Sequence, residues 1–144
     1  MPLMRVKSLM RIADPLLLLG RLLLALIFLH EGVTLSTGFA AAVSAMSRIG
    51  VAPSVLVLTI VLQLGAGSMV ALGWHARLAS LSLGLFCLAT AFLFHFNFAV
   101  RNELLHFEKD LAIAGGLFVL AATGTGALSL DRVYKRRQLP GSAA

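Results

Sequence analysis

The chain has 144 residues, of which 59% are hydrophobic and only 12% are charged, and its mean hydropathy is +0.94. An ordinary soluble domain carries about 25% charged residues, so this chain has too few charges to cover a soluble surface. The net charge of +6 could indicate nucleic-acid binding, but the basic residues cluster just outside the apolar runs, as they do beside membrane spans. The composition predicts one domain embedded in the lipid bilayer and argues against nucleic-acid binding.

The first part of the chain predicts a helix that approaches and then crosses the bilayer. Residues 1–14 form an amphipathic lead-in at the lipid headgroups, with basic side chains at Arg5, Lys7 and Arg11. Asp14 is the predicted N-cap of the first spanning helix, and Pro15 suits its first turn. The apolar run that follows is long enough to cross a bilayer. Residues 39–52 are mildly polar and predict a short interfacial helix.

Three more apolar runs complete the predicted fold class, an all-α integral membrane four-helix bundle over residues 15–131, which a basic tail follows at 132–144. The short turn 73–77 requires the second and third helices to be antiparallel, and Trp74 in this turn suits an interfacial anchor. Runs of this length without a period of two indicate helices rather than strands. The predicted spans are residues 16–34, 53–73, 78–98 and 111–130.

An even number of spans puts both termini on one side of the membrane. The Lys and Arg residues on that side are Arg5, Lys7, Arg11, Arg77, Arg132, Lys135, Arg136 and Arg137, whereas the other side has Arg48, Arg101 and Lys109. This excess predicts that both termini are cytoplasmic. The alternative is a signal peptide cleaved near residues 39–42. Arg21 and the His30-Glu31 pair argue against it, because they interrupt the apolar core that such a peptide needs.

Small residues recur four positions apart in the later runs, which is the spacing that lets helix backbones approach closely in lipid. The pairs are Gly67 and Ala71, Ser80 and Gly84, and Ala112 and Gly116. They predict close helix packing and carry no information about activity.

Two strongly polar side chains, Arg21 and Gln63, lie inside the apolar runs. An unpaired Arg at the bilayer centre costs about 2.5–3.5 kcal/mol on insertion scales. Arg21 can avoid this cost by snorkelling to the headgroups, or by a structural pair, anion or headgroup contact inside the bundle. Both alternatives stay open from the sequence.

Most of the remaining polar groups converge on the side opposite the termini, because successive helices alternate in direction. This candidate outer polar cluster consists of His30, Glu31, His95, His106, Glu108, Lys109 and Asp110. His106 and Asp110 are four residues apart and so share a helix face. His75 lies on the opposite side and is excluded.

Three interpretations compete for this cluster. The first is that its residues are wetted and hydrogen-bonded at the membrane boundary, where burial costs little. The second is a proton-handling pocket for a lipophilic redox molecule such as a quinone, with His and Glu beside aromatic and aliphatic walls. The third is a metal site of three histidines and a carboxylate, but no tight motif such as HExxH is present, and we predict none. Cys87 is the single cysteine, so the chain alone cannot run dithiol exchange.

Several short motifs occur in an order that resembles the DoxX family over about residues 14–132. They are Leu19–Leu23, His30–Gly32, Leu64–Gly67, Phe107–Ala112 and Gly124–Asp131. The resemblance implies a four-helix inner-membrane protein. Family members have been linked to quinone-coupled thiosulfate oxidation and to membrane oxidoreductase assemblies that defend against oxidative stress. Polar positions typical of the family are matched by Arg21, His95, Lys109 and Asp131.

Two positions depart from the family pattern. Leu35 stands where members often have Lys, and Gln63 stands where they often have Glu. We hypothesise that these two residues form a linked charge pair in relatives, so that losing both keeps the bundle neutral.

The sequence therefore predicts a redox-associated membrane subunit that holds a quinone or docks an oxidoreductase, within a homo- or hetero-oligomer. The absence of paired cysteines and cofactor motifs favours a subunit over a self-sufficient enzyme, and we expect no covalent cofactor. The alternative is a non-catalytic scaffold or a small-molecule permease. A permease usually has more polar groups through the bilayer middle.

Overall fold

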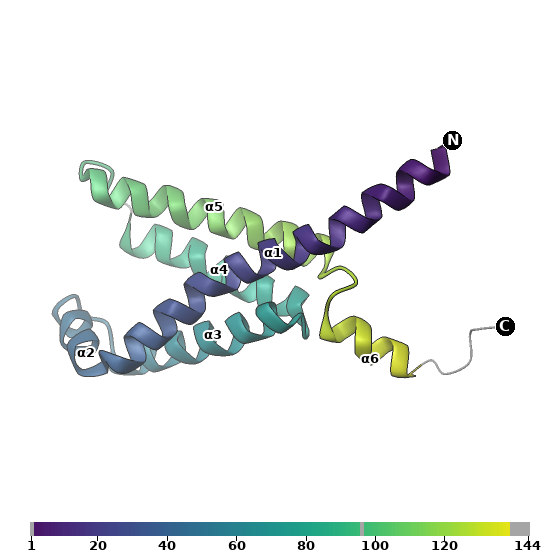
Figure 1. The fold of residues 1–144 in the computed structure, drawn as a ribbon. Coiled ribbons are helices and arrows are strands. Elements are labelled where there is room, and N and C mark those ends of the chain that lie inside the picture. Colours follow the sequence, from purple (N-terminus) through teal and green to yellow (C-terminus); the bar gives the residue numbers. More distant parts are fainter. Residues whose placement is uncertain (1, 96, 139–144) are drawn as a thin grey trace.

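The computed structural model describes the backbone of residues 2–95 and 97–138, and the side chains of residues 12–95 and 97–137. This part of the chain is all-α (Figure 1). Its six helices are α1 (Pro2–Thr37), α2 (Phe39–Arg48), α3 (Pro53–Leu72), α4 (Ala76–Phe94), α5 (Arg101–Thr123) and α6 (Leu130–Gln138). The predicted short helix after the first run is confirmed as α2, which has no buried residue.

The four long helices pack as two pairs, α1 with α3 and α4 with α5, and the α3–α4 contact joins the pairs. Figure 1 shows the pairs spread apart at the end that carries α2, and close together where α5 ends. The turn between α3 and α4 is as short as predicted, because Gly73 adopts a left-handed conformation with φ 69° and His75 follows with φ 45°. Trp74 in this turn is half exposed.

Small side chains line the helix contacts. The buried core includes Ala25, Ala66, Ala79 and Ala114 beside Phe28, Val70, Leu83 and Leu117. At Gly84 an added Cβ would lie 2.6 Å from Cε1 of Phe118, so α4 and α5 approach each other closely at this glycine. Ala112, which was predicted to pack, is exposed.

Large apolar side chains cover the outside of the bundle. Leu26, Leu58 and Leu93 are 62%, 68% and 74% exposed. Soluble monomers rarely expose apolar patches of this extent, so this surface suits lipid. Among the described residues, three helical segments are long and apolar enough to cross a membrane: Ile12–Thr37, Pro53–Leu72 and Ala76–Phe94.

Helix α5 differs from the predicted fourth span, residues 111–130. It begins ten residues earlier, at Arg101, and it ends at Thr123. Its first half carries five charged residues, which is why it is less apolar than the other three long helices: Arg101, Glu103, Glu108, Lys109 and Asp110. The predicted continuation to residue 130 is wrong, because Gly124 and Gly126 adopt positive φ angles of 85° and 72° and stop the helix. Helix α4 likewise ends at Phe94, before the predicted residue 98.

The predicted N-cap at Asp14 is also wrong. Helix α1 runs without interruption from Pro2 to Thr37 and contains Pro15. The Asp14 carboxylate instead accepts a hydrogen bond from the Ala127 N–H group at 2.7 Å, so the chain after α5 is fastened to α1. The side chains of Arg5, Lys7 and Arg11, and the end of the predicted tail at 139–144, lie outside the described residues.

Candidate functional site

A polar cluster forms where α4 ends and α5 begins. His95 is the C-cap residue of α4, whereas Glu103, His106 and Asp110 lie in the first turns of α5. Their spacing of three and four residues puts these three side chains on one face of α5. Each of them contacts a residue at the end of α4.

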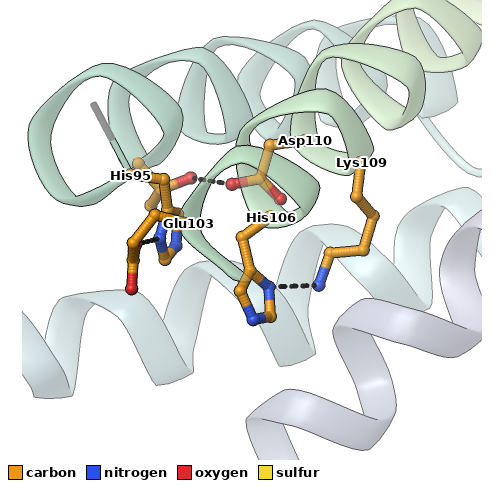
Figure 2. Close-up of polar contacts among 6 residues, drawn as sticks. His95, Glu103, His106, Lys109 and Asp110 are labelled. Carbon is orange, nitrogen blue, oxygen red and sulfur yellow. Dashed lines mark hydrogen bonds and ion pairs between the residues drawn. The ribbon is translucent and has the colours of Figure 1, made fainter. Parts of the chain in front are cut away.

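His95 is the centre of this cluster. Its Nδ1 atom lies 2.6 Å from Oε2 of Glu103, and the two side chains are only about 30% exposed, at 27% and 30%. The His95 and His106 rings stack, with centroids 5.1 Å apart and planes 26° apart. Figure 2 shows His95 beside Glu103, and the dashed contact between His106 and Lys109. The Nε2 atom of His95 makes no hydrogen bond within the described part of the chain.

Two further contacts fix the cluster. Lys109 Nζ lies 3.3 Å from Nδ1 of His106. Because an ammonium group can only donate, Nδ1 of His106 is the acceptor in this contact. Thr90 Oγ1 lies 3.2 Å from Oδ2 of Asp110, and it is also within reach of carbonyl oxygens in its own helix.

An apolar cavity of about 480 Å³ borders this cluster. Its volume is within the usual range of small-molecule sites, about 300–1,000 Å³. Three polar side chains, Thr59, Thr90 and His95, contribute to its lining. Helices α2, α3 and α4, with the short segment between α2 and α3, supply the apolar walls: Met46, Ile49, Val55, Leu58, Leu62, Phe86, Ala89, Leu93 and Phe94.

Not all of the predicted residues join the cluster. His30 and Glu31 are exposed near the end of α1, and Glu108 is exposed on α5. They form no hydrogen bond or ion pair with any residue that the structure describes. The reason is the helix pairing, since α1 packs mainly on α3 whereas the cluster belongs to α4 and α5. A shared depth in the membrane is therefore not enough to place His30 and Glu31 in contact with the residues around His95.

Sequence reasoning missed Glu103, which is the acidic partner of His95. Its spacing to His106 and Asp110 is the signal that could have revealed it. Within the described residues, no group of three or more His, Cys, Asp or Glu side chains is close enough to hold a metal ion. Cys87 is buried in α4.

Arg21 forms a separate polar contact at the other end of the bundle. Its side chain is 3% exposed, so it does not snorkel to the headgroups. Nη1 donates to the Thr125 carbonyl at 3.2 Å and Nη2 donates to the Leu128 carbonyl at 2.9 Å. The hydrogen bonds of Arg21 are therefore made inside the bundle, and their acceptors are backbone carbonyls of the loop after α5 rather than a paired side chain, an anion or a headgroup.

Asp131 and Gln63 differ in whether their side chains form hydrogen bonds. Asp131 Oδ1 accepts the His75 N–H group at 3.0 Å, and the Asp131 N–H group donates to the Gly73 carbonyl at 3.0 Å. These bonds tie the start of α6 to the α3–α4 turn. Gln63 is buried, and its Oε1 atom has no hydrogen-bond partner among the described residues.

Comparison with known proteins places the chain in a family. The DoxX family model matches residues 16–96. The chain is 38% identical to the inner membrane protein YqjF of Escherichia coli strain K12 over 88% of its length and 98% of that protein. It is 32% identical to the inner membrane protein YphA of the same strain, over 81% of its length and 89% of that protein. No solved structure matches the chain.

These matches cover most of the chain, and they agree with three helices that are long and apolar enough to cross a bilayer. The chain is a multi-pass integral protein of the inner membrane, and it belongs to the DoxX family.

Proposed function

We propose that the protein is a redox-associated membrane subunit with four spans and cytoplasmic termini, which holds a quinone for an oxidoreductase partner. The observation that carries this proposal is the apolar cavity of about 480 Å³ with His95 in its wall. A quinone needs an apolar pocket for its ring and tail, and a few polar groups that hydrogen-bond its carbonyl oxygens. The cavity offers both kinds of lining.

His95 supplies the polar end of the proposed site. Its Nδ1 atom is engaged by Glu103 at 2.6 Å, which leaves Nε2 as the ring nitrogen for a ligand. An imidazole nitrogen can donate or accept a hydrogen bond, so Nε2 can bind the carbonyl oxygen of a quinone or the hydroxyl group of a quinol. Thr90 offers a hydroxyl beside the same cavity.

The proposed reaction is a two-electron reduction with balanced protons. A quinone that accepts two electrons and two protons becomes a quinol. One proton passes to the quinone through the His95 ring, which takes up a replacement from water, and the other comes directly from water at the membrane boundary. The electrons come from the partner oxidoreductase, because the single cysteine in the chain cannot cycle between dithiol and disulfide. The protein is then a subunit that binds the acceptor and transfers a proton.

Quinone content after purification tests this proposal. The full chain is purified in mild detergent, lipophilic molecules are extracted, and quinone is quantified by mass spectrometry. We expect stoichiometric quinone in the wild type. The Ala89→Phe substitution adds a ring at a cavity-lining position and should lower the content about tenfold, because overfilling a site costs about 1–3 kcal/mol.

Three further variants separate cavity filling from general damage. Ala112→Phe adds the same ring at an exposed position of α5 outside the cavity, and it should retain quinone. His95→Ala should lose quinone, whereas His106→Ala should lose less, because His106 stacks behind His95 and does not line the cavity. Background quinone in all proteins, including the wild type, would overturn the proposal and leave a non-catalytic scaffold or permease as the working hypothesis.

A further inference from the structure

A second cavity, of about 530 Å³, lies at the opposite end of the bundle from His95. Residues from the α3–α4 turn, the glycine-rich loop after α5 and the start of α6 line it. It is separate from the proposed quinone site, because the two cavities have no lining residue in common.

The lining of this cavity is strongly basic. Arg77, Arg132 and Lys135 contribute three positive charges, against one carboxylate from Asp131. That carboxylate already accepts the His75 N–H group at 3.0 Å. The cavity therefore carries an excess of positive charge, which favours an anionic ligand.

The Gly124–Gly126 loop forms part of the wall. The Arg77 guanidinium lies against it, because a Cβ atom added at Gly124 would be 3.1 Å from Nη2 of Arg77. The N–H groups of Thr125 and Gly126 donate to no residue within the described part of the chain. Loops that leave backbone N–H groups unpaired beside basic side chains are suited to oxyanions.

The position of the cavity identifies the source of the anion. The cavity lies where the second and third candidate spans meet, between Leu72 and Ala76. The loop that lines it is hydrogen-bonded to Asp14, which lies near the start of the first candidate span. Three candidate spans therefore begin or end there, and the ends of spans lie near the lipid phosphates. Trp74, a residue type enriched at membrane–water boundaries, lies beside the cavity with its ring 5.1 Å from that of His75.

We propose that this cavity binds the phosphate group of an anionic phospholipid, with Arg77, Arg132 and Lys135 as the cationic contacts. Basic pockets between membrane helices are known to take phospholipid headgroups. The acyl chains would extend along the apolar exterior of the bundle, next to Leu78, which lines the cavity and is 65% exposed.

Trp74 is the single tryptophan of the chain, and it can report on a neighbouring lipid. The full chain is reconstituted in phosphatidylcholine vesicles that contain an equal fraction of either brominated phosphatidylglycerol or brominated phosphatidylcholine. The bromine atoms are placed on the acyl carbons nearest the glycerol and quench tryptophan fluorescence at contact. We expect stronger quenching by the brominated phosphatidylglycerol.

Charge variants test whether the cavity causes this preference. Each cation near a headgroup favours anionic lipid about fivefold, so Arg132→Gln with Lys135→Gln should lower the preference by well over tenfold. Arg136→Gln with Arg137→Gln removes the same charge from the same helix outside the cavity, and it should retain the preference. Equal loss in both variants, or equal quenching by the two brominated lipids, would overturn the proposal.

Two additional measurements complete the test. Arg132→Lys with Lys135→Arg keeps both charges and should keep the preference, which would show that the two charges rather than the particular side chains are required. Inorganic phosphate added at constant ionic strength should leave the quenching unchanged. If phosphate relieves the quenching, the proposal that the cavity binds a phospholipid is wrong, and the ligand is a soluble phosphate.

Discussion

Three segments of the chain approach one another closely at Gly73. A Cβ atom added there would lie 2.6 Å from Cβ of Ser129 and 2.7 Å from Nη1 of Arg21. Its φ of 69° is in the left-handed region that favours glycine. The absence of a side chain at Gly73 therefore allows Arg21 and the loop after α5 to pack against the α3–α4 turn.

We predict that Gly73→Ala destabilises the folded protein by about 2–4 kcal/mol, from left-handed strain and overpacking together. Thermal unfolding in detergent, followed by circular dichroism, measures the change. Gly65→Ala is the matched control, because no atom lies within 4 Å of a Cβ added at Gly65. If both variants unfold at the same temperature, the close approach at Gly73 does not contribute to stability.

A second prediction at the residue scale concerns Gln63. Its side chain is 7% exposed on α3, and its Cβ lies 3.4 Å from the position of a Cβ added at Gly32 of α1. Leu35 follows three residues later, on the same side of α1. A charge at position 63 would therefore be buried near position 35.

We expect Gln63→Glu alone to lower the amount of folded protein, because an unpaired buried charge is strongly destabilising. Adding Leu35→Lys should restore it by supplying a partner of opposite charge. Monodisperse protein recovered by size-exclusion chromatography measures both effects. If the double variant is as poor as Gln63→Glu, the linked-pair hypothesis is wrong.

At the scale of elements, the α4–α5 pair depends on a close contact at Gly84. The Phe118 ring fills the space of the missing side chain, with Cε1 at 2.6 Å and Cδ1 at 3.0 Å from an added Cβ. Phe118 is itself partly buried against the core. A side chain added at Gly84 would therefore displace the ring or move the two helices apart.

We predict that Gly84→Ala lowers stability by about 1–3 kcal/mol, the usual range for overpacking, and weakens the His95–Glu103 contact at the same helix pair. Thermal unfolding measures the first effect. Gly115→Ala on α5 is the control, since no atom lies within 4 Å of its added Cβ. Because alanine favours helix over glycine by up to about 1 kcal/mol, the control should be slightly stabilised, and a similar gain in Gly84→Ala would contradict the prediction.

The sequence predicted the helices best where an apolar run and a helix cover nearly the same residues. Helix α3 begins at Pro53 as predicted, and α1 and α4 contain most of their apolar runs. Helix α5 was misjudged because its first half carries five charged residues, and hydropathy cannot show that a polar segment continues into an apolar helix. Asp14 was misassigned because its partner, Ala127, lies 113 residues away.

The candidate site was predictable only to the level of membrane depth. His95, His106, Lys109 and Asp110 were expected at one depth, and the structure places them together on one helix pair. His30 and Glu31 were expected there too, yet α1 packs mainly on α3. Which helices pair depends on side-chain packing between segments far apart in sequence, and the hydropathy pattern does not contain that information.

At the scale of the whole molecule, the length and the position of α5 favour a fourth bilayer-spanning helix. Its 23 residues span about 34 Å at 1.5 Å per residue, and a bilayer core is about 30 Å thick. The loop after α5 is bonded to Asp14 and Arg21 of α1. Helix α5 therefore runs from the His95 end of the bundle to the end where the first span begins.

We predict that α5 is a fourth span, which puts Arg101 outside and Arg136 in the cytoplasm. Single cysteines at these two positions and at Ser47, in a Cys87→Ser background, are treated with a membrane-impermeant maleimide in spheroplasts. Ser47→Cys and Arg101→Cys should react at once, and Arg136→Cys only after permeabilisation. With three spans, positions 101 and 136 would instead lie on one side and react alike. That result would also contradict the proposal that both termini are cytoplasmic, because an odd number of spans places the two termini on opposite sides of the membrane.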